Sequence, residues 1–189
     1  MARLDLPRKK LTYNNAFEHR MQKVDKKLRE ARFFLEKMAE RAAMAFGDHE
    51  RFDFYLSAFL SAGRSVDYRL RHTSPTYPAF RAAWDKSLSA DETELIKFMV
   101  DDRNVEVHEA GSTRREEELR IPVQGIYEDA SGTLTVSSGG VPGIPVPPAQ
   151  IIRPTYSFVV CGRQVAALEA CGTYLGLLER VVRDYRNSP

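Results

Sequence analysis

The sequence has few cysteines and no long hydrophobic run, and each absence excludes a class of protein. Only Cys161 and Cys171 are cysteines among its 189 residues, which is too few for the disulfide framework of a small secreted domain. No apolar stretch approaches the roughly 20 residues that a transmembrane helix requires. The first residues, MARLDLPRKKLTYNN, include basic side chains but no apolar core of the kind found in signal peptides. We therefore expect a cytoplasmic protein with no membrane contact.

The sequence is also poor in ligands for metals and nucleotides. The four histidines show no H-E-x-x-H spacing, neither cysteine belongs to a CxxC pair, and no glycine-rich phosphate loop is present. We interpret the two thiols as small apolar packing groups. We therefore expect neither a metal ion nor a cofactor.

The composition is that of an ordinary globular domain with an uneven distribution of charge. Hydrophobic residues make up 43% and charged residues 29%, and the length suits one elaborated domain over residues 1–189. The formal net charge is +4 over residues 1–50, +3 over residues 51–90 and −7 over residues 91–130. The basic segments either attract a polyanion such as nucleic acid or form a solvated face without a partner.

Apolar residues at helical spacing predict three long helices, over about residues 15–45, 50–72 and 164–186. Phe80 and Trp84, four residues apart, predict a short helix between residues 76 and 88. Ser89 and Glu92 have the S-x-x-E spacing of a capping box, so a further helix should begin there and run through His108. The chain should therefore fold mainly into α-helices.

Alternating apolar residues replace the helical pattern after residue 118. Leu119, Ile121 and Val123, followed by Leu134 and Val136 beyond a turn-rich segment, predict a β-hairpin. A Gly/Pro-rich loop covers residues 139–148, and residues 155–160 predict a third strand. We therefore expect residues 119–160 to form a small antiparallel β insertion before the final helix.

The helix that ends at His108 carries an unusual set of polar side chains. Arg103 lies in the middle of its apolar stripe, whereas Asn104 and His108 continue a polar row along the edge. The stripe contains Ile96, Met99, Val100 and Val107, and the polar row begins with Lys97 and Asp101.

An arginine on an apolar stripe needs partners for its donors, because an unpaired buried charge is costly. Three explanations of Arg103 are open. It forms an ion pair, for instance with Asp67, it anchors a dimer interface, where arginine is enriched, or it faces a cleft that receives phosphate.

Arg103, the polar Asn104 and His108 match the R-x4-H form of the R-x4-6-H motif of the HEPN superfamily, whose members are α-helical bundles found in many prokaryotic toxin and defence systems. The position of the motif late on a helix, before a strongly amphipathic final helix, also resembles that family. The resemblance implies an up-and-down helical bundle, and the β insertion predicted from the alternating residues would lie within it. It further implies a metal-independent endoribonuclease, in a toxin-antitoxin or defence system, with RNA as the substrate and Arg103, Asn104 and His108 as the catalytic residues.

The side chains suit this chemistry, because RNA supplies its own nucleophile, the 2′-hydroxyl beside the scissile phosphate. An imidazole such as that of His108 has an ordinary pKa of about 6.5 and transfers protons near neutral pH. The planar guanidinium of Arg103 matches phosphate oxygens. Asn104 would orient the imidazole or the phosphate.

The resemblance also implies protein partners. On an ideal helix Arg103 and His108 point about 140° apart, so a compact site requires the arginine to curl round, the helix to unwind, or two protomers to lay their motif helices together. The family favours the last arrangement, so we expect a homodimer. An antitoxin or a nucleotidyltransferase is a further partner of the kind found in the family. In the toxins that pair with a nucleotidyltransferase, the motif continues to a tyrosine two residues past the histidine. Here Ala110 stands at that position, so regulation through such a tyrosine is not expected.

Two other functions are compatible with the same residues. The first is a noncatalytic HEPN-like module that binds RNA, a nucleotide or a protein, with Arg103 serving structure or ligand binding. The second is a helical interaction protein in which the R-x4-H spacing is a coincidence.

Overall fold

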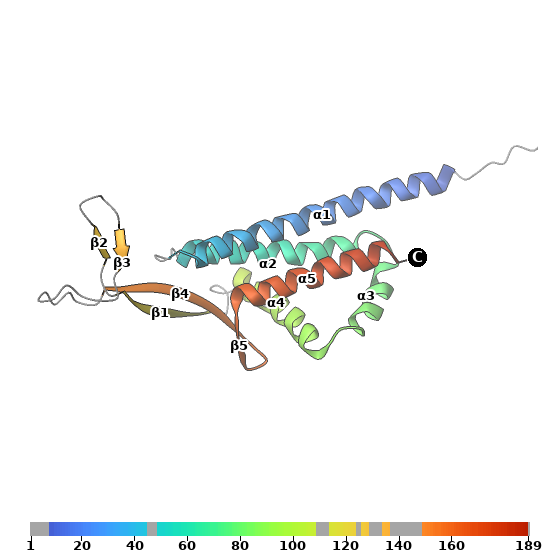
Figure 1. Cartoon of the computed structure of the whole chain (residues 1–189). Helices are drawn as coiled ribbons and strands as arrows, with labels where there is room; N and C mark the ends of the chain where they lie inside the picture. The colour runs from blue at the N-terminus through green and yellow to red at the C-terminus, as the bar shows by residue number, and fades with distance from the viewer. Residues whose placement is uncertain are drawn as a thin grey trace, which may run out of the picture.

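The computed structural model in Figure 1 shows a mainly helical protein with strands inserted before the last helix. It describes residues 8–44, 49–108, 114–123, 126–128, 134–136 and 149–188, with side chains for residues 15–44, 50–102, 114–115, 117 and 155–188. Within these ranges the elements are α1 (Arg8–Ala42), α2 (His49–Arg71), α3 (Tyr77–Asp85), α4 (Ala90–His108), β1 (Arg115–Val123), β2 (Ile126–Glu128), β3 (Leu134–Val136), β4 (Ala149–Val160), β5 (Arg163–Ala166) and α5 (Ala167–Arg186). The five helices of the described residues confirm the mainly helical prediction.

The core lies where α1, α2 and α5 pack together. α1 and α2 pack side by side (Figure 1). Asp25 pairs with Arg186 at 2.9 Å and Arg32 pairs with Glu179 at 2.5 Å, so α5 runs antiparallel to α1. The fully buried side chains repeat at helical spacing, and they include Met21, Val24 and Met38 of α1, Phe52, Leu56, Phe59, Val66 and Leu70 of α2, and Cys171 of α5.

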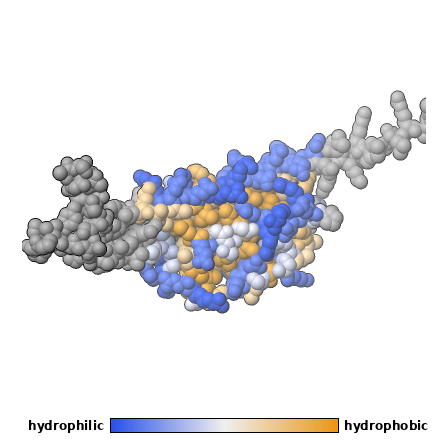
Figure 2. Space-filling model, in the orientation of Figure 1, coloured by the Kyte–Doolittle hydropathy of each residue, from blue (hydrophilic) through white to orange (hydrophobic). Residues whose placement is uncertain are grey.

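The surface of the helical part separates hydrophilic from apolar residues. Figure 2 shows hydrophilic residues along the outer edge of α1 and apolar residues over the middle of the helical part. This is the amphipathic pattern from which the long helices were predicted. Among the described residues, no helix combines the length and the apolar character needed to cross a bilayer.

The start of α4 is fixed by the predicted capping box. The Glu92 carboxylate accepts a hydrogen bond from the Ser89 backbone N–H at 2.8 Å, and the Ser89 hydroxyl accepts one from the Glu92 N–H at 3.2 Å. The other carboxylate oxygen of Glu92 accepts from Arg180 of α5 at 2.8 Å. The box therefore satisfies the first donors of α4 and also ties this helix to α5.

The predicted hairpin between residues 119–123 and 134–136 is wrong, because these two segments do not pair with each other. β1 pairs with β4, from Arg115 opposite Ser157 to Val123 opposite Ala149, and β3 pairs with β2 over three residues. The antiparallel sheet has the order β1-β4-β5. A ladder along the whole of β1 satisfies many more backbone groups than a three-residue pairing, which explains why the distant partner is preferred.

The final helix begins later than the sequence indicated, because residues 163–166 form β5 instead of a first helical turn. Cys161 and Gly162 both have positive φ, 50° and 76°, which is the requirement of a type I′ turn between two antiparallel strands. The resulting hairpin pairs Val160 with Arg163 and Ser157 with Ala166. The turn is hard to recognise because cysteine is an uncommon residue at a position of positive φ.

Aromatic contacts attach the sheet to the helices. Tyr156 of β4 stacks on Phe52 of α2 with 3.7 Å between the ring centroids. Phe158 meets Phe98 of α4 edge to face at 5.2 Å. These contacts hold β4 against α2 and against α4, the helix that carries the motif.

Candidate functional site

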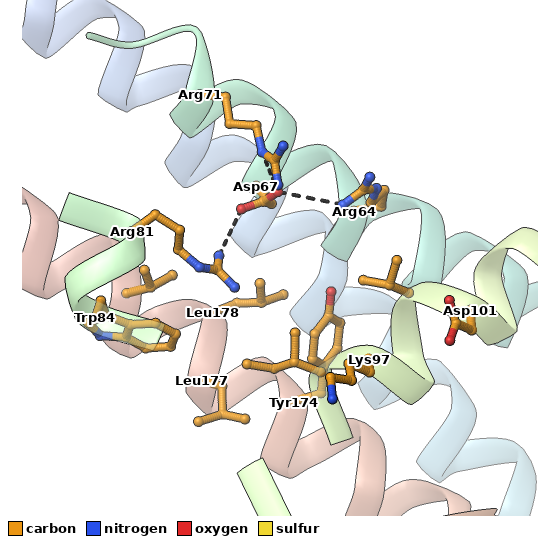
Figure 3. A pocket seen from close by; sticks show the side chains of 13 residues that line it. Arg64, Asp67, Arg71, Arg81, Trp84, Lys97, Asp101, Tyr174, Leu177 and Leu178 are labelled. Atoms are coloured by element: carbon orange, nitrogen blue, oxygen red, sulfur yellow. Dashed lines mark hydrogen bonds and ion pairs between the residues drawn. The ribbon is translucent and has the colours of Figure 1, made fainter. Parts of the chain in front are cut away.

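A pocket of about 340 Å³ opens between α2, α3, α4 and α5, a size within the usual range of ligand sites. We call it the arginine pocket. Figure 3 shows charged side chains from α2 and α3 on one side of it and apolar side chains from α5 on the other. The lining residues are Arg64, Asp67 and Arg71 of α2, Arg81 and Trp84 of α3, Ile96, Lys97, Val100 and Asp101 of α4, and Tyr174, Leu177, Leu178 and Val181 of α5.

One carboxylate, that of Asp67, holds the three arginines of the pocket in place. It accepts hydrogen bonds from Arg81 Nη1 at 2.8 Å and Arg71 Nε at 2.9 Å, and it lies 3.5 Å from Arg64 Nη1 (Figure 3). The Tyr77 hydroxyl also donates to it at 3.2 Å. Asp67 is only 7% exposed, so a buried anion sets the positions of the guanidinium groups around it.

Arg81 is the most enclosed of these arginines, with 17% of its side chain exposed. Its Nε donates to Asp85 at 2.7 Å, and its guanidinium lies 5.1 Å from the centre of the Trp84 ring. Burial opposes the charge of Arg81, but hydrogen bonds to Tyr77 and Asp85 raise its pKa overall. Burial raises the pKa of Tyr77 to about 12. Arg81 therefore stays a cation, and Tyr77 stays protonated, near neutral pH.

The pocket has an excess of positive charge at its rim. Four cations and two carboxylates line it, for a formal charge of +2. Arg81 is matched by Asp67 and Asp85, and Lys97 pairs with Glu94 at 2.8 Å. The side chains of Arg64 and Arg71 are 41% and 57% exposed, and within the described residues Asp67 is the one carboxylate that pairs with them. Each guanidinium has five N–H donors, so most of these donors remain for a bound anion.

A tyrosine that lines the pocket has no hydrogen-bond partner for its hydroxyl among the described residues. Tyr174 is 4% exposed and points from α5 toward α2 (Figure 3), and within the described residues its hydroxyl forms no hydrogen bond. Burial raises the pKa of Tyr174 to about 12, so the hydroxyl stays a donor. The ring packs on Gly63, where a Cβ would lie 2.9 Å from Tyr174 Cε1. Glycine is therefore needed at position 63 to leave room for the ring.

The backbone of all three residues predicted as catalytic, Arg103, Asn104 and His108, lies in α4, and their side chains lie outside the described residues. Position 103 continues the helix row of Ile96 and Val100, and positions 104 and 108 continue the row of Lys97 and Asp101. The earlier members of both rows line the arginine pocket. Asp67, one candidate partner of Arg103, forms ion pairs with Arg64, Arg71 and Arg81.

The charged residues and the tyrosine that line the pocket were not predicted from the sequence as parts of a site. Arg64, Asp67 and Arg71 have i, i+3 and i+4 spacings that place them on one face of α2, and this spacing was the available signal. Arg81 and Tyr174 gave no local signal, because α3 and α5 bring them to the pocket from distant parts of the sequence.

The described residues contain no cluster of three or more histidine, cysteine or acidic side chains arranged to hold a metal ion. Cys171 is buried in the core, and burial raises the pKa of its thiol. A protonated, enclosed thiol is suited to packing rather than to nucleophilic chemistry. Cys161 is exposed, in the turn between β4 and β5.

Comparison with known proteins gives no relative, since no family model, no curated protein and no solved structure matches the chain. The resemblance to the HEPN superfamily therefore depends on the motif in α4 and on the helical fold around it.

Proposed function

We propose that the chain is a metal-independent endoribonuclease of the HEPN type, acting at a site formed by α4 and the arginine pocket. The observation that carries the proposal is that the pocket and the motif share one helix. The two rows of α4 that line the pocket are the rows that continue to Arg103, Asn104 and His108. An RNA strand held by the cationic rim would therefore run beside the motif.

The proposed reaction needs only the RNA and the three side chains of the motif. An imidazole of His108 takes the proton of the 2′-hydroxyl, and the resulting oxygen attacks the adjacent phosphorus. The bond from phosphorus to the 5′-oxygen breaks, and this oxygen takes a proton from the protonated imidazole of His108. The products are a 2′,3′-cyclic phosphate and a 5′-hydroxyl. Arg103 stabilises the charge on the phosphate oxygens, and Asn104 orients the phosphate or the imidazole.

The proposal includes a homodimer with an up-and-down bundle in each subunit. Arg103 and His108 point about 140° apart on a straight helix, so a composite site would combine the arginine of one copy with the histidine of the other. Two motif helices meeting at a twofold axis would also bring two cationic pockets to one RNA strand. An antitoxin or nucleotidyltransferase remains a proposed partner of the family kind.

A second candidate is a noncatalytic module that binds a phosphate-bearing ligand at the arginine pocket. The observation that favours it is the composition of the pocket. Its described lining supplies four cations, two carboxylates, a phenol and apolar walls but no histidine or cysteine. These groups are sufficient for binding, and they include no side chain that transfers protons near neutral pH.

The test is cleavage of RNA by the purified chain in the presence of EDTA. We expect 2′,3′-cyclic phosphate ends, and we expect His108→Ala to reduce the rate by about 10²- to 10⁴-fold, the usual contribution of a general acid or base. His19→Ala, which removes an exposed histidine of α1, is the matched control and should cleave normally. Mixing Arg103→Ala chains with His108→Ala chains should restore part of the activity if the site is composite.

Two results would refute the nuclease. One is cleavage that depends strictly on added metal, and the other is cleavage by His108→Ala at the wild-type rate. Binding of RNA without any cleavage by the wild-type chain would support the second candidate. A monomer in light scattering at micromolar concentration would refute the composite site alone.

A further inference from the structure

We propose that the arginine pocket is a subsite for one unpaired nucleotide of single-stranded RNA. Its base would enter the pocket, its phosphate would bind Arg64 and Arg71 at the rim, and the neighbouring base would stack on the exposed ring of Tyr68. The inference rests on the proposed function for the identity of the ligand, and it concerns where the strand binds rather than how it is cut.

The exposed ring of Tyr68 is the first feature that points to a nucleic-acid base. Tyr68 is 62% exposed, and it lies on α2 four residues after Arg64 and three before Arg71. The ring of His72 lies 4.4 Å from it, and His72 Nδ1 is 2.8 Å from the Tyr68 carbonyl oxygen, so this histidine is held against the tyrosine. A restrained, exposed aromatic ring beside two cations is the combination that binds single strands without base pairing.

The rim arginines are arranged to receive a phosphate. Asp67 engages Arg71 through Nε at 2.9 Å and lies 3.5 Å from Arg64 Nη1, which leaves the outer N–H groups of both side chains for another acceptor. Because the carboxylate holds each guanidinium, less side-chain entropy is lost when a phosphate binds. Guanidinium groups bind phosphate oxygens in a bidentate manner, so two of them can hold one phosphate firmly.

The interior of the pocket suits a base. Trp84, Leu177 and Val181 provide apolar contacts, and Tyr174 adds a hydroxyl that no described residue uses as a hydrogen-bond partner. A nucleobase has two apolar faces and a polar edge, so it would bury its faces and satisfy this hydroxyl at once. The bases of a duplex are stacked and paired, so they cannot enter without being extruded at a cost. The pocket should therefore select single strands.

The test uses the full chain carrying His108→Ala, which keeps the RNA intact if the wild-type chain is a nuclease. Binding of a labelled single-stranded RNA of mixed sequence is followed by fluorescence anisotropy. Tyr68→Ala should weaken binding by about 5- to 100-fold, the usual range for loss of one stacked base. Phe54→Ala is the matched control, because Phe54 is 60% exposed on the same helix, and it should bind as the parent does.

Two further variants separate binding of the phosphate from binding of the base. The double variant Arg64→Gln with Arg71→Gln should lower the dependence of log affinity on log salt by about 0.7 for each phosphate that the protein no longer neutralises. Tyr174→Phe keeps the ring and removes only the hydroxyl, so it should weaken binding by about 2- to 10-fold. Trp84 is the single tryptophan of the chain and lines the pocket, so its fluorescence should change with the same affinity as the anisotropy.

Duplex RNA binding as tightly as single-stranded RNA would overturn the subsite, and so would Tyr68→Ala binding like Phe54→Ala. An unchanged Trp84 fluorescence at saturation would overturn it as well. These results are independent of cleavage. A wild-type chain that cuts RNA while Tyr68→Ala and the arginine variant bind and cut normally refutes the subsite and leaves the nuclease standing. Binding that depends on Tyr68 and the rim arginines, with no cutting, refutes the nuclease and leaves the subsite standing.

Discussion

Replacing Asp67 by asparagine should destabilise the fold by about 2 to 3 kcal/mol, because it removes the charge that holds the arginines. Arg71 and Arg64 are 57% and 41% exposed, so water screens them and each pair contributes at most about 1 kcal/mol. Most of the loss comes from Arg81, which is 17% exposed and would lose the buried end of its ion pair. Removing the partner of a buried charge costs about 3 to 5 kcal/mol. The loss at Arg81 should be smaller than this, because Asp85 still accepts a hydrogen bond from Arg81 at 2.7 Å.

Urea denaturation and thermal unfolding measure the effect, and a loss of this size should lower Tm by roughly 5 to 10 °C for a chain of this length. Asp85→Asn is the control, because Asp85 is 49% exposed and its removal should cost less than about 1 kcal/mol. Adding Arg81→Met to Asp67→Asn should cost less than the two single changes together, since the pair is removed as a unit. Stability within about 0.5 kcal/mol of the wild type, or strictly additive effects, would refute this account of the pocket.

The packing of the pocket and the buried phenols give two further predictions. Gly63→Ala should destabilise the fold by about 1 to 3 kcal/mol, because the added methyl group would overpack against Tyr174. Gly176→Ala has open space around its Cβ and should stabilise the helix by about 0.5 to 1 kcal/mol. Stability changes of the same sign for the two variants in urea denaturation would contradict this contrast. Burial raises the pKa of Tyr77 and Tyr174 to about 12, above the unfolded value of about 10. Their stabilising contribution should therefore be complete below pH 10 and lost as pH rises from 10 through about 12, and titration of all eight tyrosines together near pH 10 in ultraviolet absorbance would disprove it.

The helices could be predicted because their signals are local and repeated. In α1 the spacing of Met21, Val24 and Met38 already marks the buried face, and all three are fully buried. The capping box at Ser89 and Glu92 is a contact between residues three apart, so its sequence spacing was sufficient to locate the start of α4. Long amphipathic helices with marked ends are therefore readable without any knowledge of their neighbours.

The strand pairing could not be predicted, because the partner of a strand is set by contacts between distant residues. Residues 119–123 and 134–136 lie in strands, as their alternating apolar residues predicted. Alternation does not identify the partner of a strand, and β1 pairs with the distant β4. Residues 163–166 suited a helix by spacing alone. Only the positive φ of Cys161 and Gly162 makes them a strand, and cysteine gives no sign of such a turn in sequence.

The two parts of the proposed site differ for the same reason. Arg103, Asn104 and His108 lie close together in sequence, so the motif could be recognised in one segment. Asp67 and Arg81 come from α2 and α3, and their 2.8 Å contact depends on the turn between these helices. A pocket assembled from four helices leaves no single stretch of sequence to recognise, apart from the spacing of its residues on α2.

The shared helix α4 has a consequence for how RNA would be read. His108 lies seven residues beyond Asp101, the last residue of α4 that lines the pocket, and a rise of 1.5 Å per residue puts the two about 10 Å apart along the axis. Within one subunit, a nucleotide whose base fills the arginine pocket would place its phosphate at Arg64 and Arg71 on the rim and not at His108. The base that the pocket holds would therefore belong to a nucleotide beside the cleaved bond rather than at it. Any base preference of the proposed nuclease would then arise at a flanking position, through Tyr174 and the walls of the pocket, and not from Arg103, Asn104 and His108.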